Sequence, residues 1–322
     1  MSALKVKDRK NNIIKEEIGN MNMMKLPEWY ENMLIKEYGI ELKDRIIDGY
    51  DKKRATSFRA NKLKVKDDFV EKELNKLDIK FNKYEKIQNS FIIDNNAKLN
   101  DKLRSSTMYE NGEIYIQSLS SMLPPLILDP KAGEDILDMT AAPGGKTTEI
   151  AALTDNGANI TAIEMNNARF EKMKFNIEKQ GANVYCLKQD ARLISDFMKF
   201  DKILLDAPCS GSGTLNTNTN FEKYFTPQLI KKTIGLQEKL LTKALKIAKK
   251  GSIIIYSTCS ILKEENEEIL RKVIKKSSSE IVPIEIKEDE YLKFLPTNIK
   301  GTICVMPNEF FEGFFISKIK KL

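Results

Sequence analysis

The chain has 322 residues, of which 41% are hydrophobic and 31% charged, and its net charge is +7 at pH 7. No apolar run approaches the roughly 20 residues that span a bilayer, so we expect a globular protein without a membrane partner. There is no histidine, which excludes Ser-His-Asp and Cys-His catalysis and histidine zinc sites. The four cysteines show neither a C-x-x-C pair nor disulfide-like spacing, which favours a reduced, cytoplasmic setting with no metal site.

The N-terminal third predicts a small α/β domain after a short leader. We expect a weakly ordered leader over residues 1–24, because this stretch is charged and polar and has no apolar signal-peptide region. The small domain is expected over residues 25–107. Its predicted elements are helices at 27–39, 41–48 and from 67 onward, and strands at 58–61 and 90–94. Proline at position 27 and glycine at position 39 are a typical helix start and stop.

A run of positive charge crosses the first of these strands. Between Asp51 and Lys66 there are seven basic residues and one acid, with the aromatic residues Tyr50 and Phe58 close by. A solvated face is the ordinary explanation of a short basic run, but clustering with aromatics is also typical of a surface that contacts phosphates. The candidate contacts are Lys52, Lys53, Arg54, Arg59, Lys62 and Lys64.

From residue 108 the pattern changes to repeated strand-then-helix units, which predicts a second domain over residues 108–322. Strands are expected at 135–139, 160–164, 184–187, 202–205 and 252–256, with helices at 146–153, 167–179, 227–249 and 264–275. This alternation predicts an α/β, Rossmann-like fold: a mostly parallel sheet with helices on both faces. Two last strands, at 301–305 and 313–319, would add an antiparallel C-terminal edge.

Two cysteines follow two of these strands directly. Cys209 lies in Leu-Asp-Ala-Pro-Cys-Ser-Gly and Cys259 in Tyr-Ser-Thr-Cys-Ser. Open α/β sheets bind ligands outside the carboxyl ends of their strands, so the two thiols are expected to converge on one cleft. A buried cysteine is more often a small hydrophobe, but a position just past a strand and before a serine favours a functional role.

A glycine-containing turn, Thr140 to Thr147, joins the first parallel strand to its helix. It lacks the G-x-G-x-x-G of a dinucleotide site and misses the P-loop pattern by one residue, since Thr140 stands where the first P-loop glycine would be. S-adenosylmethionine is the third candidate ligand. Glu164 after the second strand could hold its ribose and Asp190 after the third its adenine amine, whereas a helix cap or a surface charge would explain either acid alone.

At this point the sequence resembles a known family, the RsmB/NSUN-type (Nop2/Sun) RNA (cytosine-5) methyltransferases. The matching stretches are Arg59 to Lys64, Ile116 to Met122, Leu137 to Thr147, Asp206 to Gly211, Ser257 to Ser260 with Glu265 to Glu267, and Gly313 to Phe315. They cover the chain from about residue 57 onward, in the family's order. The family's usual cysteine is Thr140 here.

The resemblance implies a Rossmann-like S-adenosylmethionine-dependent methyltransferase that acts on a cytosine in structured RNA. It implies Cys259 as the nucleophile and Cys209 as the residue that assists product release. The cofactor would lie against Ala142, Pro143, Gly144, Gly145, Lys146, Glu164, Arg169, Asp190 and Asp206. The basic residues from Lys52 to Lys64 would contact RNA; we expect a monomer, and rRNA rather than tRNA as substrate.

The chemistry needs further groups. A thiolate adding to C6 of cytosine makes C5 nucleophilic, and a proton donor at N3 must balance the charge. Asp206, at the strand end beside both thiols, is the candidate for N3 if it is protonated or shares a proton; how the thiolate forms without histidine stays open. The alternatives are a non-catalytic RNA-binding or ribosome-assembly factor on the same fold, an exocyclic-amine methyltransferase and a P-loop ATPase.

Overall fold

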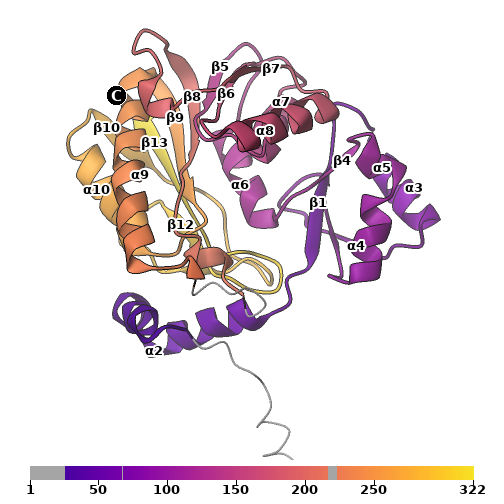
Figure 1. Cartoon of the computed structure of the whole chain (residues 1–322), viewed down its shortest axis with the longest axis horizontal. Coiled ribbons are helices and arrows are strands. Elements are labelled where there is room, and N and C mark those ends of the chain that lie inside the picture. The colour runs from indigo at the N-terminus through magenta and orange to yellow at the C-terminus, as the bar shows by residue number, and fades with distance from the viewer. Residues whose placement is uncertain (1–25, 67, 217–222) are drawn as a thin grey trace, which may run out of the picture.

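The computed structural model describes residues 26–66, 68–216 and 223–322, so the leader expected over residues 1–24 lies outside the described part. A large sheet with helices on both faces occupies one side of the molecule, and a small sheet with short helices packs beside it (Figure 1). No helix within the described residues is long and apolar enough to cross a membrane.

The large sheet is mostly parallel. Its parallel strands are β5 (Asp135–Asp138), β6 (Asn159–Ile163), β7 (Val184–Leu187), β8 (Phe200–Asp206) and β9 (Ala248–Thr258), in the order β7-β6-β5-β8-β9. Antiparallel strands continue it beyond β9: β13 (Phe314–Lys321), β12 (Ile303–Val305) and β11 (Phe294–Leu295), while β10 (Ser279–Val282) pairs with β13. The predicted parallel sheet with an antiparallel C-terminal edge is confirmed.

Helices cover both faces of this sheet because successive strand residues point to opposite sides. Leu205 of β8 packs in the core shared with α9 (Pro227–Ile247) and α10 (Glu267–Ile274), whereas Leu204 packs in the core shared with α6 (Leu119–Leu128) and α7 (Gly145–Leu153). Helix α8 (Asn167–Gln180) packs through Phe170, Met173 and Ile177 against Ala162 of β6. The sequence analysis did not predict α6, which holds Pro124 and Pro125 in its interior.

The small sheet is antiparallel and has the order β2-β3-β1-β4. Its strands are β1 (Thr56–Ala60), β2 (Asn82–Lys83), β3 (Ser90–Ile93) and β4 (Ile114–Ile116), and its helices are α3 (Phe69–Lys76), α4 (Ala97–Arg104) and α5 (Thr107–Glu110). Strand β4 lies beyond the domain boundary expected at residue 107, yet it pairs with β1. The small unit therefore extends at least to residue 116.

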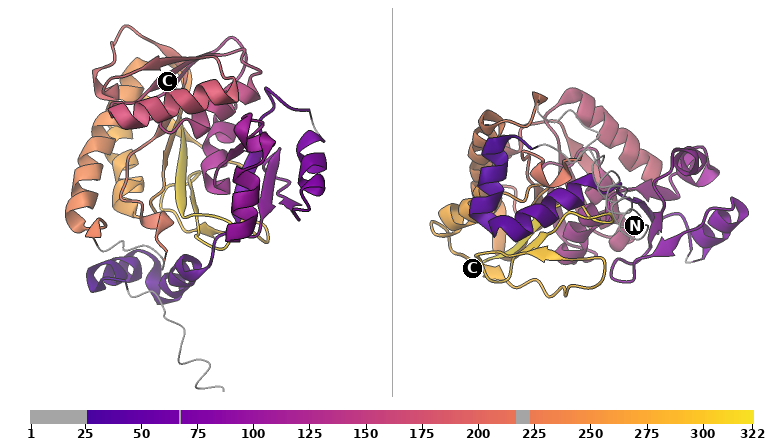
Figure 2. Two further views of the ribbon diagram at one scale, coloured as in Figure 1. Left: turned by 45° about the vertical axis from the view of Figure 1, so that its right-hand side comes forward. Right: turned by 90° about the horizontal axis from the view of Figure 1, so that it is seen from below.

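Helix α2 (Glu28–Asp51) runs across the lower edge of the large sheet and bends midway, as the view from below shows (Figure 2). The bend is at Gly39, whose φ of 80° is left-handed, and it separates the two helices predicted at 27–39 and 41–48. Tyr30 and Tyr50 are fully buried in the core of the large sheet. The expectation that this helix belongs to the small domain is therefore wrong, because its buried apolar residues pack against the core of the large sheet.

Candidate active site

The two thiols meet where β8 and β9 end. Asp206 lies opposite Ser257 in the parallel pairing of these strands, so the loops that carry Cys209 and Cys259 leave the sheet side by side. The sulfur atoms are 3.0 Å apart, and both residues are partly buried. The predicted convergence of the two cysteines is thus present in the structure.

A cleft of about 390 Å³ opens beside Cys259. Its size lies within the range of small-ligand pockets. The walls come from the glycine turn, β4 and α6, the end of β8 and the C-terminal strand: Tyr115, Ile116, Gln117, Ser118, Ser121, Asp138, Thr140, Ala141, Ala142, Pro143, Gly145, Lys146, Asp206, Thr214, Cys259, Glu312 and Phe314. Cys209 is absent from these lining residues, so of the two thiols Cys259 is the one presented to a ligand.

Cys209 is hydrogen-bonded to the other thiol of the pair. Its hydrogen bond with Cys259, together with burial, raises the pKa of the Cys209 thiol well above its usual value. The two sulfur atoms are 3.0 Å apart, and either thiol can be the donor. Of the two sulfur atoms, that of Cys259 belongs to the residue that lines the cleft, which is the position expected of a nucleophile.

Lys146 and Asp206 form an ion pair in the cleft. The Lys146 ammonium donates to Oδ2 of Asp206 at 2.7 Å and to Oγ of Ser121 at 2.6 Å, and Oδ1 of Asp206 accepts from Oγ of Ser257 at 2.8 Å. Burial alone would lower the pKa of Lys146, but the charge and hydrogen bond of Asp206 outweigh it and the net pKa is raised. The lysine is therefore charged, and Asp206 shares its protons. Sequence reasoning placed Lys146 only in the cofactor turn.

The turn before α7 brings its backbone to the cleft. Gly144 has a left-handed φ of 101° and caps α7, and its neighbours Pro143 and Gly145 line the cleft. An anionic or polar ligand end fits at such a helix start, because the first N–H groups point outward. The residues at this turn therefore suit the carboxylate of an S-adenosylmethionine-like ligand.

Glu164, Arg169 and Asp190 lie at the ends of β6 and β7, beyond the cleft lining. Arg169 donates to the carbonyl of Ala142 at 2.9 Å and pairs with Glu164 at 3.5 Å, so it links the turn to the end of β6. Asp190 caps η1 (Ala191–Leu193), and its ion pair with Arg192 lowers the pKa of the Asp190 carboxyl. Glu164 and Asp190 follow β6 and β7 at the same edge of the sheet, and Arg169 lies in the first turn of α8; their contacts with a nucleoside remain predictions.

The sequence analysis gave no role to several residues of the cleft, among them an ionisable one at the end of β5. Asp138, the last residue of β5, lines the cleft and is 1% exposed. Thr147 donates to its Oδ2 at 2.7 Å, but Oδ1 has no hydrogen-bond partner. Burial raises the pKa of this carboxyl to about 6. Its place before the turn was visible in the sequence, but its burial was not.

The expectation that Arg59 contacts RNA is wrong. Arg59 is 3% exposed, and its guanidinium donates to Oε1 of Gln117, the carbonyl of Gly145 and Oγ1 of Thr148. It also lies 3.9 Å from a carboxylate oxygen of Glu149. The side chain thus reaches from β1 to the first turn of α7, so it supports the glycine turn from inside the protein.

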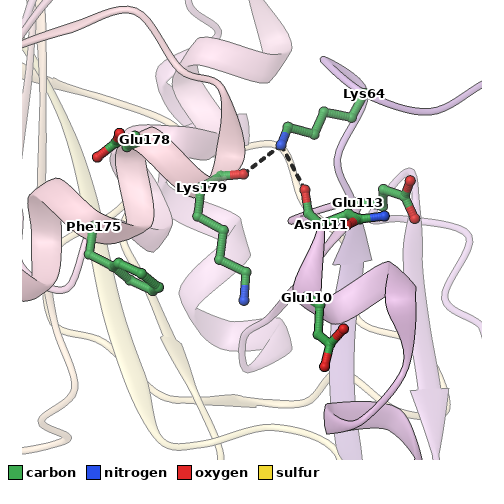
Figure 3. A pocket seen from close by; sticks show the side chains of 7 residues that line it. All are labelled: Lys64, Glu110, Asn111, Glu113, Phe175, Glu178 and Lys179. Atoms are coloured by element: carbon green, nitrogen blue, oxygen red, sulfur yellow. Dashed lines mark hydrogen bonds between the residues drawn. The ribbon is translucent and has the colours of Figure 1, made fainter.

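The other basic residues of this run differ in their contacts and in their exposure. The Lys64 ammonium donates to the carbonyls of Asn111 and Lys179 at 2.7 Å each, which ties the small unit to the end of α8 (Figure 3). Arg54 is half-buried and lies 3.6 Å from Glu312 of the cleft. Lys52 and Lys53 are exposed, and Lys62 is half-buried. The RNA contacts expected from Lys52, Lys53, Arg54, Lys62 and Lys64 remain predictions.

Solved structures define the class of the protein. A methyltransferase homolog protein from Pyrococcus horikoshii is 33% identical, with a TM-score of 0.79 over 92% of this chain and 96% of that one. NSun6 from the same organism, solved with SFG, has a TM-score of 0.80 at 23% identity and covers 92% of this chain and 98% of its own. The chain therefore has the Rossmann-like fold of S-adenosylmethionine-dependent methyltransferases.

Residues 125–320 match the sequence model of the family described as 16S rRNA methyltransferase RsmB/F, and the chain belongs to this family. The tRNA (cytosine(72)-C(5))-methyltransferase of Pyrococcus horikoshii is 36% identical over 66% of this chain and 54% of its own length. The tRNA (cytosine(49)-C(5))-methyltransferase of Pyrococcus abyssi is 33% identical over 66% and 72%. The ribosomal RNA small subunit methyltransferase F of Shewanella loihica is 33% identical over 70% and 49%. The chain thus spans about half the length of two of these relatives.

Proposed function

We propose that this protein transfers a methyl group from S-adenosylmethionine to C5 of a cytosine in structured RNA. The observation that carries the proposal is the thiol pair: one sulfur in a small-ligand cleft, the other 3.0 Å behind it. Relatives that are named for cytosine-C5 methylation of tRNA support the same reaction. An exocyclic-amine methyltransferase or a P-loop ATPase has no use for such a pair.

The first step is addition to the base. The sulfur of Cys259, as a thiolate, bonds to C6 of cytosine, and the electron pair of the C5–C6 double bond moves toward C5 and N3. The ion pair of Lys146 and Asp206 lines the same cleft and supplies the proton or positive charge that N3 needs. In this scheme Asp206 contacts N3 of the cytosine. A carboxyl group in this role must be protonated or share a proton, and Asp206 shares the protons of the Lys146 ammonium.

S-adenosylmethionine supplies an electrophilic methyl group when bound. The turn residues Ala142 to Lys146 would hold its amino-acid end, Glu164 its ribose and Asp190 its adenine amine, with Arg169 bracing the turn through Ala142. Phe314 forms an apolar part of the wall of the same cleft.

Product release needs a base behind the nucleophile. After methyl transfer the C5 proton must leave, its electron pair restores the C5–C6 bond, and the C6–S bond breaks to return the Cys259 thiolate. Cys209 is adjacent to this sulfur, so it can act as a relay that accepts the C5 proton while its own proton passes to the sulfur of Cys259 as that sulfur leaves. Loss of Cys209 should therefore trap the chain on its RNA. The target base must leave its stack or lie in a single strand to reach the cleft.

The test uses the full chain with methyl-labelled S-adenosylmethionine and rRNA and tRNA from cells that lack the protein. Label recovered as 5-methylcytidine is the expected result, and mapping the labelled fragment separates rRNA from tRNA. The family description favours rRNA and two archaeal relatives favour tRNA. Absence of label in every RNA fraction, with cofactor bound, would favour the non-catalytic assembly factor instead.

A further inference from the structure

Two neighbouring residues outside the cleft hold the two cysteine loops separately. The first is Glu265, in η4 (Lys263–Glu265), which is fully buried. Its Oε1 accepts from the backbone N–H of Ser210 at 2.8 Å and its Oε2 from Oγ of the same serine at 2.5 Å. Both bonds grip the residue that directly follows Cys209.

Two residues of helix α9 also donate hydrogen bonds to the carboxylate of Glu265. Oγ1 of Thr233 donates to Oε1 of Glu265 at 2.7 Å, and Nε2 of Gln237 lies 3.2 Å from the same oxygen. Gln237 also donates to the carbonyl of Pro208, the residue before Cys209, at 2.9 Å. Cys209 is therefore held on both sides by one carboxylate and one amide.

The second residue is Asn266, which is 1% exposed. Its Oδ1 accepts from Oγ1 of Thr258 at 2.6 Å, and its Nδ2 donates to the carbonyl of Ser260 at 2.9 Å. These two partners flank Cys259. The side chain of Asn266 thus holds the nucleophile's loop as Glu265 holds the loop of Cys209.

The backbone between the two side chains is anchored as well. The hydroxyl of Tyr256, on β9, donates to the carbonyl of Glu265 at 2.6 Å. A buried carboxylate is costly unless its oxygens are hydrogen-bonded, and the donors around Glu265 are neutral groups. The carboxylate therefore depends on the Ser210, Thr233 and Gln237 donors, and through them it is tied to the loop of Cys209.

We propose that Glu265 and Asn266 are positioning residues that set the 3.0 Å contact of the two sulfurs, each serving one thiol and one half of the reaction. The proposal rests on the proposed function. Asn266 orients Cys259 for addition to C6. Glu265 orients Cys209 for the removal of the C5 proton, after which Cys259 is released.

The experiment measures two quantities with RNA substrate and S-adenosylmethionine: the rate of methyl transfer and the amount of denaturation-stable protein–RNA adduct. Glu265→Gln places an amide donor against the N–H and hydroxyl donors that now face the carboxylate. Turnover should fall and the adduct should rise by about tenfold or more, since sub-ångström misplacement of a reacting group is enough for such losses. Asn266→Ala should lower turnover without raising the adduct.

The Cys209→Ala chain isolates the addition step, because in it the adduct forms and is not released. In this background Asn266→Ala should slow adduct formation by about tenfold or more, whereas Glu265→Gln should leave its rate unchanged. Glu268→Gln, an exposed residue on the adjoining helix turn, is the matched control and should change neither quantity. Ser210→Ala removes the hydroxyl bond to Glu265 and the longer bond that this hydroxyl accepts from the Ser212 N–H at 3.3 Å, and it replaces Glu265→Gln if that variant does not fold.

The outcomes are distinguishable. If Glu265→Gln and Asn266→Ala lower addition and release to the same degree in parallel with the melting temperature, the two residues are structural and the proposal is wrong. If wild type transfers no methyl group and the Cys209→Ala chain forms no adduct, the proposed function fails rather than the positioning. The proposal is supported if both variants melt at the wild-type temperature, the adduct rises in Glu265→Gln, and it does not rise in Asn266→Ala.

Discussion

Two regions that stand out in the sequence behave in opposite ways when the chain folds. The thiol centre (Cys209, Cys259, Lys146 and Asp206) draws residues from three separate stretches of sequence into contact. The basic segment (residues 52–66) is continuous in sequence, but the structure sends its members to different places: Arg59 into the joint, Lys64 onto two carbonyls, and Lys52 and Lys53 to the surface.

The contrast shows what each kind of pattern can predict. Residues that follow parallel strands share one edge of the sheet, whatever their distance in sequence. The basic segment crosses several local structures, since only Arg59 lies in β1 and its other basic residues come before or after this strand, so a run of like charge does not form one surface. A comparison of the two regions therefore predicts large catalytic effects at the first, and a mixture of stability and binding effects at the second.

Replacing the nucleophile should have the largest effect. Cys259→Ala should lower methyl transfer by about 10⁴-fold or more, as loss of a catalytic nucleophile does elsewhere. Cofactor binding and the melting temperature should change little, because the side chain is small and partly exposed. The measurement is single-turnover transfer of labelled methyl; a comparable loss from Cys209→Ala without any trapped adduct would reverse the roles of the two thiols.

Removing the cleft cation comes next. Lys146→Met should lower kcat by about 10²- to 10³-fold, the usual cost of losing one charge-stabilising donor. Lys131→Met removes an exposed lysine that pairs with Asp129 and serves as the control. An unchanged kcat with a raised KM for S-adenosylmethionine would place Lys146 in cofactor binding alone.

The buried arginine tests the second region. Arg59→Met should destabilise the protein by about 3–5 kcal/mol, because the buried Glu149 loses its charged partner. Urea unfolding followed by Trp29 fluorescence measures this. The salt dependence of RNA binding should not change, and a slope that falls by about one would return Arg59 to the RNA surface.

The orphaned carboxyl predicts a pH effect. The pKa of Asp138 rises from 3.8 unfolded to about 6 folded, so the folded state binds the proton more tightly and loses stability as pH rises through this window. Asp138→Asn removes that loss. Its unfolding free energy relative to wild type should rise by up to about 3 kcal/mol between pH 4 and pH 7 and then level off. A difference that is flat with pH would contradict the buried, half-satisfied carboxyl.

The smallest effect is expected on the surface. Lys52→Ala with Lys53→Ala should weaken RNA binding a few-fold and reduce the slope of log affinity against log salt by about one to two. Stability should stay the same because both side chains are exposed. The control pair is Lys275→Ala with Lys276→Ala, two exposed lysines after α10. Equal slopes in all three proteins would remove the basic segment from the RNA interface.

The elements of the large sheet follow from local pattern. Apolar, β-branched runs such as Ile253–Tyr256 predict buried parallel strands, and β9 contains this run. Helix α6 was missed because two prolines interrupt its sequence and its residues are apolar on nearly every side, so no helical period shows. Strand β4 was missed because it has three residues, too few for an alternating pattern.

The sequence by itself determined the parallel sheet, the glycine turn after its first strand and the convergence of two thiols, because all three depend on strand order and on where strands end. Only the tertiary structure decided the rest. Burial separated Arg59 from Lys52, and packing placed α2 on the large core through Tyr30 and Tyr50. The pairing of Lys146 with Asp206 and the grip of Glu265 and Asn266 arise between elements distant in sequence. Such contacts are set by three-dimensional distance and desolvation, which no local pattern records.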